Sequence, residues 1–276
     1  MKIGFIDYYL SEWHANNYPA WIREICERDG LDYEIAYAWG EIEVSPRDGK
    51  TNTEWARENG VELCATMEEV CEKSDVLLIL APSNPEKHLE YAKVALRYGK
   101  RTYIDKTFTP CEADAKEIFA LADQYGASVF STSALRYAAE LDEMKGACNV
   151  ITTGGGRSAD EYIVHQIEMI VKLLGCGAKA VKAEKQGKQC IFRICYGEAG
   201  AATAIYDPSF GFSLTAELND GSTKNLAVNS NFFLTLMEKI LCFYETGKTD
   251  FEREETIAVM KLRERLLAAS DAWETL

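Results

Sequence analysis

The sequence predicts an α/β fold in two parts, a doubly wound parallel sheet followed by an α+β domain with a largely antiparallel sheet. Short apolar runs alternate with amphipathic stretches in the first half, which is typical of strands and helices that take turns along a parallel sheet. Beyond about residue 145, strand-like runs follow one another with helices at the margins, which favours antiparallel pairing. We therefore predict two domains, at residues 1–125 and 126–276.

The strands of the first domain are expected at residues 2–6, 33–38, 61–64, 75–80, 101–104 and 128–131. The helices between them are expected at residues 19–28, 53–59, 67–72, 85–98 and 112–125. A glycine lies at or just beyond the end of most of these helices, where a left-handed backbone favours it. Because these strands are expected to be parallel, a ligand should lie beyond their carboxyl ends.

The second domain is expected to open with a strand at 148–153, which leads through three glycines into a helix at 159–174. Further strands are expected at residues 180–184, 189–196, 201–206, 213–218 and 223–228. The sequence Asn219-Asp220-Gly221 between the last two of them is a hairpin signal. Helices at 232–246 and 253–274 are expected to close the chain.

The composition excludes several classes of protein. With 44 acidic and 30 basic residues the net charge is −14, which disfavours general binding to nucleic acid or to an anionic membrane surface. No apolar run is long enough for a membrane helix, and the N-terminal run is too short for a signal peptide. The nine cysteines include no Cys-x-x-Cys pair and only three histidines accompany them, so we expect a cytoplasmic protein without a metal site.

The turn after the first strand lacks the glycines with which a dinucleotide-binding protein receives a pyrophosphate. Counted from the end of the strand, the three glycine positions fall at Asp7, Tyr9 and Glu12. A carboxylate repels a pyrophosphate, and the tyrosine ring blocks a close approach of the backbone. The acidic residue that would hold a ribose after the second strand is also missing from residues 36–39.

Polar residues follow two central strands. In the loop at residues 80–88, Asn84 and Pro85 have an ordinary reading as a helix start, with His88 on the solvent side. Asp105 and Lys106 come directly after the next strand, where a lysine is usually a surface residue. A catalytic lysine at this place would need a pKa lowered by burial or by a neighbouring cation.

The helix at residues 159–174 has an apolar face, which must be core, and a polar stripe opposite it. The stripe consists of Glu161, His165, Glu168 and Lys172. It can be a solvated face with a helical ion pair between Glu168 and Lys172. Alternatively, His165 lies in a cleft and Glu161, one turn away, sets its protonation. The spacing leaves both interpretations open.

In order and spacing, these segments resemble the glucose–fructose oxidoreductase / inositol dehydrogenase / MocA family of nicotinamide-dependent dehydrogenases. The loop at 82–88 and the helix end at 95–100 are similar to the family's proline–asparagine–histidine loop and the helix that follows it. Asp105-Lys106-Thr107 stands where the family has Glu-Lys-Pro. Arg136 matches an arginine after the sixth strand, and the helix from Glu161 to His165 matches the family's Asp-x-x-x-His.

The resemblance implies a Rossmann-like first domain and hydride exchange between NAD or NADP and a sugar, polyol or related hydroxy compound. It implies that Lys106 and His165 share the proton transfer while Glu161 orients the histidine. The cofactor would contact the loop after the first strand and the strand ends, namely Asp7, Tyr8, Ala81, Pro82, Asn84, His88, Asp105 and Lys106. It also implies a homodimer or homotetramer through the sheet of the second domain.

Two alternative hypotheses about the function remain open. Asp7, Tyr9 and Glu12 favour a family member that has lost dinucleotide binding and serves as a ligand-binding or assembly protein. A non-redox lyase or hydrolase could use Lys106 and His165 as acid and base. The retention of three separated matching residues favours the oxidoreductase with an atypical cofactor loop.

Overall fold

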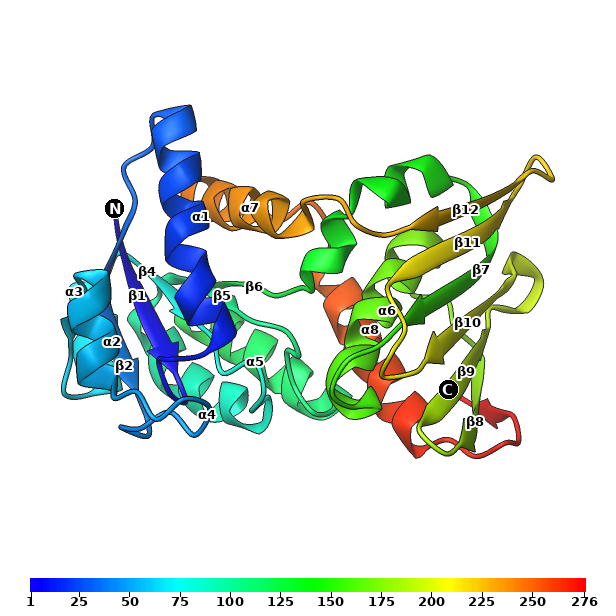
Figure 1. Ribbon diagram of the computed structural model, residues 1–276, viewed down its shortest axis with the longest axis horizontal. Helices are drawn as coiled ribbons and strands as arrows, with labels where there is room; N and C mark the ends of the chain where they lie inside the picture. The colour runs from blue at the N-terminus through cyan, green and yellow to red at the C-terminus, as the bar shows by residue number, and fades with distance from the viewer. The chain divides into compact units, whose positions relative to one another are not determined.

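The computed structural model describes residues 1–276, which divide into two compact units. The first unit consists of Met1–Ser131 with Leu236–Asp250, and the second of Thr132–Thr235 with Phe251–Leu276. The predicted fold class is confirmed, because a parallel six-stranded sheet forms the first unit and a mostly antiparallel seven-stranded sheet the second (Figure 1).

The sheet of the first unit has the strand order β3-β2-β1-β4-β5-β6, and all its pairings are parallel. Its strands are β1 (Lys2–Asp7), β2 (Glu34–Gly40), β3 (Glu62–Leu63), β4 (Val76–Ile79), β5 (Arg101–Ile104) and β6 (Ser128–Phe130). The order reverses between β1 and β4, so the crevice that receives ligands in such sheets lies at the carboxyl ends of these two strands.

The helices of this unit are α1 (Trp13–Asp29), α2 (Asn52–Asn59), α3 (Met67–Lys73), α4 (Glu86–Ala95) and α5 (Glu112–Tyr125). The predicted start of the first helix at residue 19 is wrong, because Pro19 lies inside α1 and Glu12 is its N-cap. A proline resembles a helix start in the sequence, and a cap in the preceding turn can override it. The predicted helix at 85–98 divides into α4 and a 3₁₀ turn at Leu96–Tyr98.

Lys100 caps the C-terminal end of helix α3. Lys100 Nζ donates to the backbone carbonyls of Cys71, Glu72 and Ser74 at the C-terminal end of the helix. These carbonyls have no partner within the helix, so a cation there satisfies them and also complements the helix dipole. The lysine of the predicted helix-end motif therefore has a structural role in this chain.

The segment Leu236–Asp250, which contains most of α7 (Phe232–Thr246), completes the core of the first unit. The Oη atom of Tyr244 donates to the carbonyl of Leu77 in β4 at 2.7 Å. Arg101 donates to the backbone carbonyls of Tyr244 and Glu245. The buried tyrosine thus ties a late segment of the chain to the central strand of the parallel sheet.

The sheet of the second unit has the order β12-β11-β7-β10-β9-β8-β13. Its strands are β7 (Ala147–Gly154), β8 (Ala180–Gln186), β9 (Gln189–Cys195), β10 (Ala201–Tyr206), β11 (Ser213–Leu218), β12 (Thr223–Ala227) and β13 (Glu274–Thr275). Only β7 and β10 pair in parallel. Helices α6 (Ala159–Leu174) and α8 (Arg253–Ala268) pack against each other, and α6 lies on the sheet (Figure 1). The predicted last helix is too long, because α8 ends at Ala268 and the predicted final residue, Glu274, already pairs with β8 in β13.

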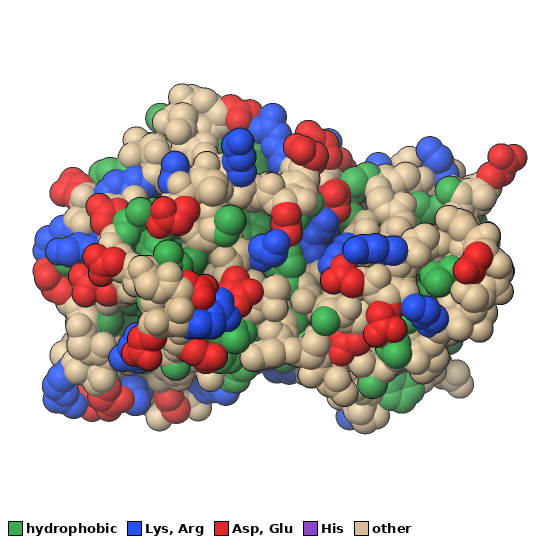
Figure 2. All heavy atoms as spheres, turned by 90° about the horizontal axis from the view of Figure 1, so that it is seen from above, with side chains coloured by type: hydrophobic (Ala, Val, Ile, Leu, Met, Phe, Trp, Pro, Cys, Tyr) green, Lys and Arg blue, Asp and Glu red, His purple; other side chains and the backbone are tan.

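Acidic and basic side chains are interspersed over the face that Figure 2 shows. None of the helices combines the length and the apolar character that crossing a membrane requires.

Candidate functional site

Two carboxyl groups flank the turn between β1 and α1. Asp7 ends β1 and is 1% exposed, and its Oδ1 atom accepts from the backbone N–H of Tyr8 at 2.7 Å and of Ala81 at 3.0 Å. Glu12 is 4% exposed and accepts from the backbone N–H of Ala15 at 2.5 Å as the N-cap of α1. The turn predicted to lack a glycine cradle therefore holds two buried acids.

Burial raises the pKa of Asp7 well above its ordinary value, and the neighbouring charge of Glu12 raises it further. The hydrogen bonds from Ala81 and Tyr8 act in the opposite direction. Burial also raises the pKa of Glu12, while His14 opposes that shift. Because Oδ1 of Asp7 accepts two N–H groups, a proton on this carboxyl resides on Oδ2, which is buried and has no hydrogen-bond partner.

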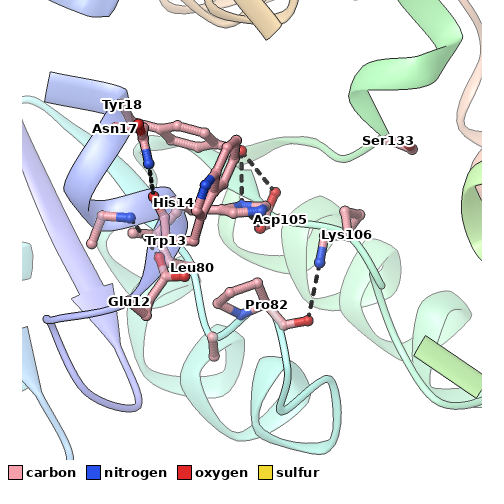
Figure 3. Close-up of polar contacts among 12 residues, drawn as sticks. Glu12, Trp13, His14, Asn17, Tyr18, Leu80, Pro82, Asp105, Lys106 and Ser133 are labelled. Atoms are coloured by element: carbon pink, nitrogen blue, oxygen red, sulfur yellow. Dashed lines mark hydrogen bonds and ion pairs between the residues drawn. The ribbon is translucent and has the colours of Figure 1, made fainter. Parts of the chain in front are cut away.

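Asp105 follows β5 and is fully buried among groups that stabilise its charge. Its Oδ2 atom lies 2.5 Å from Nδ1 of His14, and its Oδ1 atom accepts from the hydroxyls of Tyr18 and Tyr103 at 3.3 Å each. Figure 3 shows His14 and Tyr18 reaching from α1 toward this carboxylate. Burial acts to raise the pKa of Asp105, but His14 and the charge of Lys106 hold it below its ordinary value.

Lys106 extends from the same strand end. Its Nζ atom donates to the backbone carbonyl of Pro82 at 3.3 Å, across the ends of β4 and β5 (Figure 3). The peptide bond between Lys106 and Thr107 is cis. The predicted catalytic lysine therefore lies at the carboxyl edge of the sheet, beside the buried ion pair of Asp105.

The other predicted residues of the β4 loop have mostly local partners. Ala81 has a positive φ of 48° and gives its N–H to Asp7. The predicted N-cap of α4 is wrong, because Pro85 occupies that position and Asn84 bonds Glu86 at 2.9 Å. His88 is fully buried rather than solvent-facing, and its ring nitrogens lie 2.5 Å from the Leu80 carbonyl and 2.9 Å from the Phe108 carbonyl. His88 thus ties two loops together.

Sequence reasoning missed an acid at the end of β2. The strand was expected to stop at residue 38, but it pairs with β1 as far as Gly40, opposite Asp7. The residue after the strand is therefore Glu41, which accepts from Tyr91 Oη at 2.6 Å and pairs with Lys87 at 2.7 Å. The apolar run of β2 continues through Trp39, and that continuation is the signal that could have identified Glu41.

In the second unit, His165 lies on α6 with a polar partner and two aromatic neighbours. Its Nδ1 atom is 2.7 Å from the hydroxyl of Ser133, and its ring contacts Tyr162 and Phe212 edge-on. Glu161 pairs with Arg157, with an Nε–Oε2 distance of 2.7 Å. Ser133 is a further residue that the sequence did not suggest, because nothing in its neighbourhood sets it apart from other serines.

Glu168, one turn beyond His165, is buried rather than part of a solvated stripe. It accepts from the backbone N–H of Ser133 at 3.1 Å and lies 3.4 Å from Arg136, which also pairs with Glu255. Burial raises the pKa of Glu168 and the charge of Arg136 opposes the shift. Lys172 donates to the carbonyl of Arg136 at 2.8 Å, so the expected helical pair is replaced by longer-range contacts.

One group of side chains in the first unit could in principle hold a metal ion. Glu62, Cys64 and Glu69 bring ligand atoms within 4.8 Å of one another. Lys73 pairs with both carboxylates at 2.6 Å, so one of their two charges is offset within the chain.

Residues 41–133 match the model of a family described as "Oxidoreductase family, NAD-binding Rossmann fold". The uncharacterized oxidoreductase YhhX of Escherichia coli is 34% identical over 92 residues, which are 33% of this chain and 27% of YhhX.

Two solved structures share the fold over almost their whole length. A probable dehydrogenase from Thermotoga maritima superimposes with a TM-score of 0.80 at 10% identity, covering 100% of this chain and 98% of that one. The UDP-N-acetylglucosamine 3-dehydrogenase GnnA from Acidithiobacillus ferrooxidans superimposes with a TM-score of 0.77 at 11% identity, covering 98% of each chain.

Proposed function

We propose that the chain is a nicotinamide-dependent oxidoreductase of the glucose–fructose oxidoreductase, inositol dehydrogenase and MocA family, whose NAD-binding model residues 41–133 match. Its substrate is a sugar, polyol or related hydroxy compound. The observation that carries the proposal is Lys106 at the carboxyl edge of the parallel sheet, beside the buried charge of Asp105 and within the matched residues. The sugar-nucleotide dehydrogenase GnnA, which shares the fold, supports a sugar-like substrate.

Lys106 and His165 share the movement of one proton in this proposal. Removal of a hydride from a carbinol carbon leaves a hydroxyl proton that a base must accept. A histidine is suited to accept it near neutral pH, and an ammonium group stabilises the developing alkoxide. The hydride itself is the chemistry of the nicotinamide cofactor.

Ser133 positions His165 in the same proposal. A hydroxyl 2.7 Å from Nδ1 holds the ring and selects its tautomer, which leaves Nε2 for the substrate. Glu161 stays a proposed contributor, one helical turn before His165, although its carboxylate has Arg157 as a partner.

The residues of the first unit fit one part of a dinucleotide and not another. Glu41 at the end of β2 suits the hydroxyls of an adenosine ribose, and its charge favours NAD over NADP because it repels a 2′-phosphate. At the start of α1, where a pyrophosphate is usually received, Glu12 and Asp7 do not fit an anion.

We also propose self-association through the open face of the second sheet, within a cytoplasmic protein. Ile151 in β7 is 46% exposed, and Ile205 of β10 and Ile191 of β9 follow it on the same face. A second copy of the chain would cover these apolar side chains. Nine free cysteines support a reducing compartment.

The test is a titration of the purified protein with NADH and, separately, with NADPH. Nicotinamide fluorescence and calorimetric heat report binding directly. Saturable binding, tighter for NADH, supports the proposal. If neither dinucleotide binds at millimolar concentration, the oxidoreductase function is overturned.

A second candidate function has one specific observation in its favour. The buried acids Asp7 and Glu12 support a family member that no longer binds a dinucleotide and serves as a ligand-binding or assembly protein. The same titration separates the two functions, since this candidate requires that neither dinucleotide binds.

A further inference from the structure

The start of α1 already holds an anion that belongs to the chain. The backbone N–H groups in the first turn of a helix have no partners within the helix, and they are what a phosphate binds. Here Glu12 accepts from one of them, the N–H of Ala15, at 2.5 Å. The carboxylate of Glu12 therefore occupies the hydrogen-bonding position that a dinucleotide phosphate would take.

Glu12 also differs from an ordinary N-cap, which is usually exposed to solvent. It is 4% exposed, so an incoming phosphate cannot share the helix end with it and water cannot screen its charge. The carboxylate must leave, or lose its charge, before a second anion can approach the same N–H groups.

The surroundings of Glu12 are acidic as well. Asp7 from the end of β1 and Asp105 from the end of β5 both interact with it, and the histidine that faces it is His14 from α1. The Oδ2 atom of Asp7 is buried beside this turn without a hydrogen-bond partner. A buried carboxyl oxygen without a hydrogen-bond partner needs an explanation, either a proton that it carries or a bound group that contacts it.

We propose that Glu12 is an internal competitor for the phosphate position at the start of α1, which a dinucleotide must displace in order to bind. This inference rests on the proposed function. It assigns to one side chain the control of dinucleotide affinity in this chain. Protonation of Glu12 removes the competing charge, so binding is favoured by acidic solution.

The experiment compares Glu12→Gln and Glu12→Asn with the wild type in calorimetric titrations with NADH. Asparagine is a good neutral N-cap, so the second variant guards against loss of the helix start. Glu24→Gln is the matched control, because it changes the net charge equally from an exposed position on the same helix. We expect both Glu12 variants to bind NADH roughly tenfold or more tightly than the wild type at about pH 8. The control should change the affinity less than about twofold.

The pH dependence gives a second measure. The advantage of the Glu12 variants should shrink as the pH falls, because burial raises the pKa of the wild-type carboxyl and it takes up a proton at a higher pH than an ordinary glutamate does. If the wild type binds NADH well and the Glu12 variants bind it equally or more weakly, the inference is overturned and the proposed function stands. If no variant binds NADH at any pH, both are overturned.

Discussion

The Nδ1 atom of His14 lies 2.5 Å from the Oδ2 atom of Asp105, which joins the first turn of α1 to the end of β5. The histidine is 6% exposed and the aspartate is fully buried, so water has little access to this contact. Lys106 is the next residue in the chain. The pair therefore fixes the backbone from which the proposed catalytic lysine extends.

Asp105→Asn should destabilise the protein by about 3–5 kcal/mol, because it leaves His14 and two tyrosine hydroxyls facing an amide in a buried site. Urea unfolding followed by circular dichroism measures the change in the free energy of unfolding. Asp32→Asn, the same substitution at an exposed position, should shift it by less than about 0.5 kcal/mol. Equal effects of the two substitutions would contradict the role given to the pair.

Asp7→Asn should stabilise the protein in neutral and alkaline solution. The folded state holds a proton on Asp7 that the unfolded chain releases, because burial and Glu12 raise the pKa of the folded group. Stability is therefore lost as the pH rises above the ordinary value of 3.8 toward the raised pKa, by about 1.4 kcal/mol per pH unit. Asparagine keeps the acceptor for Tyr8 and Ala81 but has no proton to lose.

Thermal unfolding from about pH 4 to pH 9 measures this effect. The melting temperature of Asp7→Asn should exceed that of the wild type by most at high pH and by least near pH 4. Parallel curves for the two proteins would show that Asp7 does not hold a proton in the folded state.

Glu41→Ser should shift the cofactor preference from NADH toward NADPH by roughly tenfold or more, as the ratio of two dissociation constants. The substitution removes the charge that repels a 2′-phosphate, and it takes from Lys87 its partner at 2.7 Å, so that only the exposed pair with Glu90 competes with that phosphate for the lysine. Glu43→Ser, two residues along the chain, is the control and should leave the ratio unchanged. An unchanged ratio in Glu41→Ser would remove Glu41 from the cofactor site.

Lys106→Ala and His165→Ala should each lower turnover by about 100-fold or more while the affinity for NADH changes by less than about threefold. The proton transfer assigned to these side chains belongs to the chemical step and not to cofactor binding. Steady-state kinetics and fluorescence titration measure the two quantities separately. Lys93→Ala on the exposed side of α4 is the control. Losses of turnover and affinity in equal measure would contradict both roles.

Ile151→Asp should convert the proposed homo-oligomer into a monomer, because it places a charge in the centre of the open face of the second sheet. Light scattering after size-exclusion chromatography measures the mass against 30.9 kDa for one chain. Val44→Asp, at a position in the first unit that is 49% exposed, is the matched control. A monomeric wild type would reject the self-association.

The sequence predicts most of the fold because each element has its own local signal. The apolar run of β4 and the glycines that end α2 and α5 mark boundaries that depend on neighbouring residues alone. The start of α1 is predicted wrongly because only local signals are visible in the sequence. Pro19 gives such a signal, whereas the cap by Glu12 exists only in the folded turn. The predicted end of β2 is two residues too early, and for that reason the sequence analysis does not identify Glu41 as the acid after this strand.

The candidate site is less predictable because its contacts join distant parts of the chain. His14 and Asp105 are 91 residues apart, and Ser133 and His165 are 32 apart. No periodicity or spacing connects such pairs. Each of these side chains also has an ordinary surface interpretation in the sequence, as does His88, which the structure buries completely.

The division of the first unit into two stretches of sequence has a consequence for how the protein is made. During synthesis, residues 1–131 emerge long before residues 236–250, which supply Tyr244 and its bond to Leu77. Part of the core of the parallel sheet therefore stays exposed until the whole of Thr132–Thr235 has been translated. A fragment that ends at residue 131 should be recovered from cells as aggregated or chaperone-bound chain, whereas co-expression with a peptide spanning residues 236–250 should restore part of its solubility.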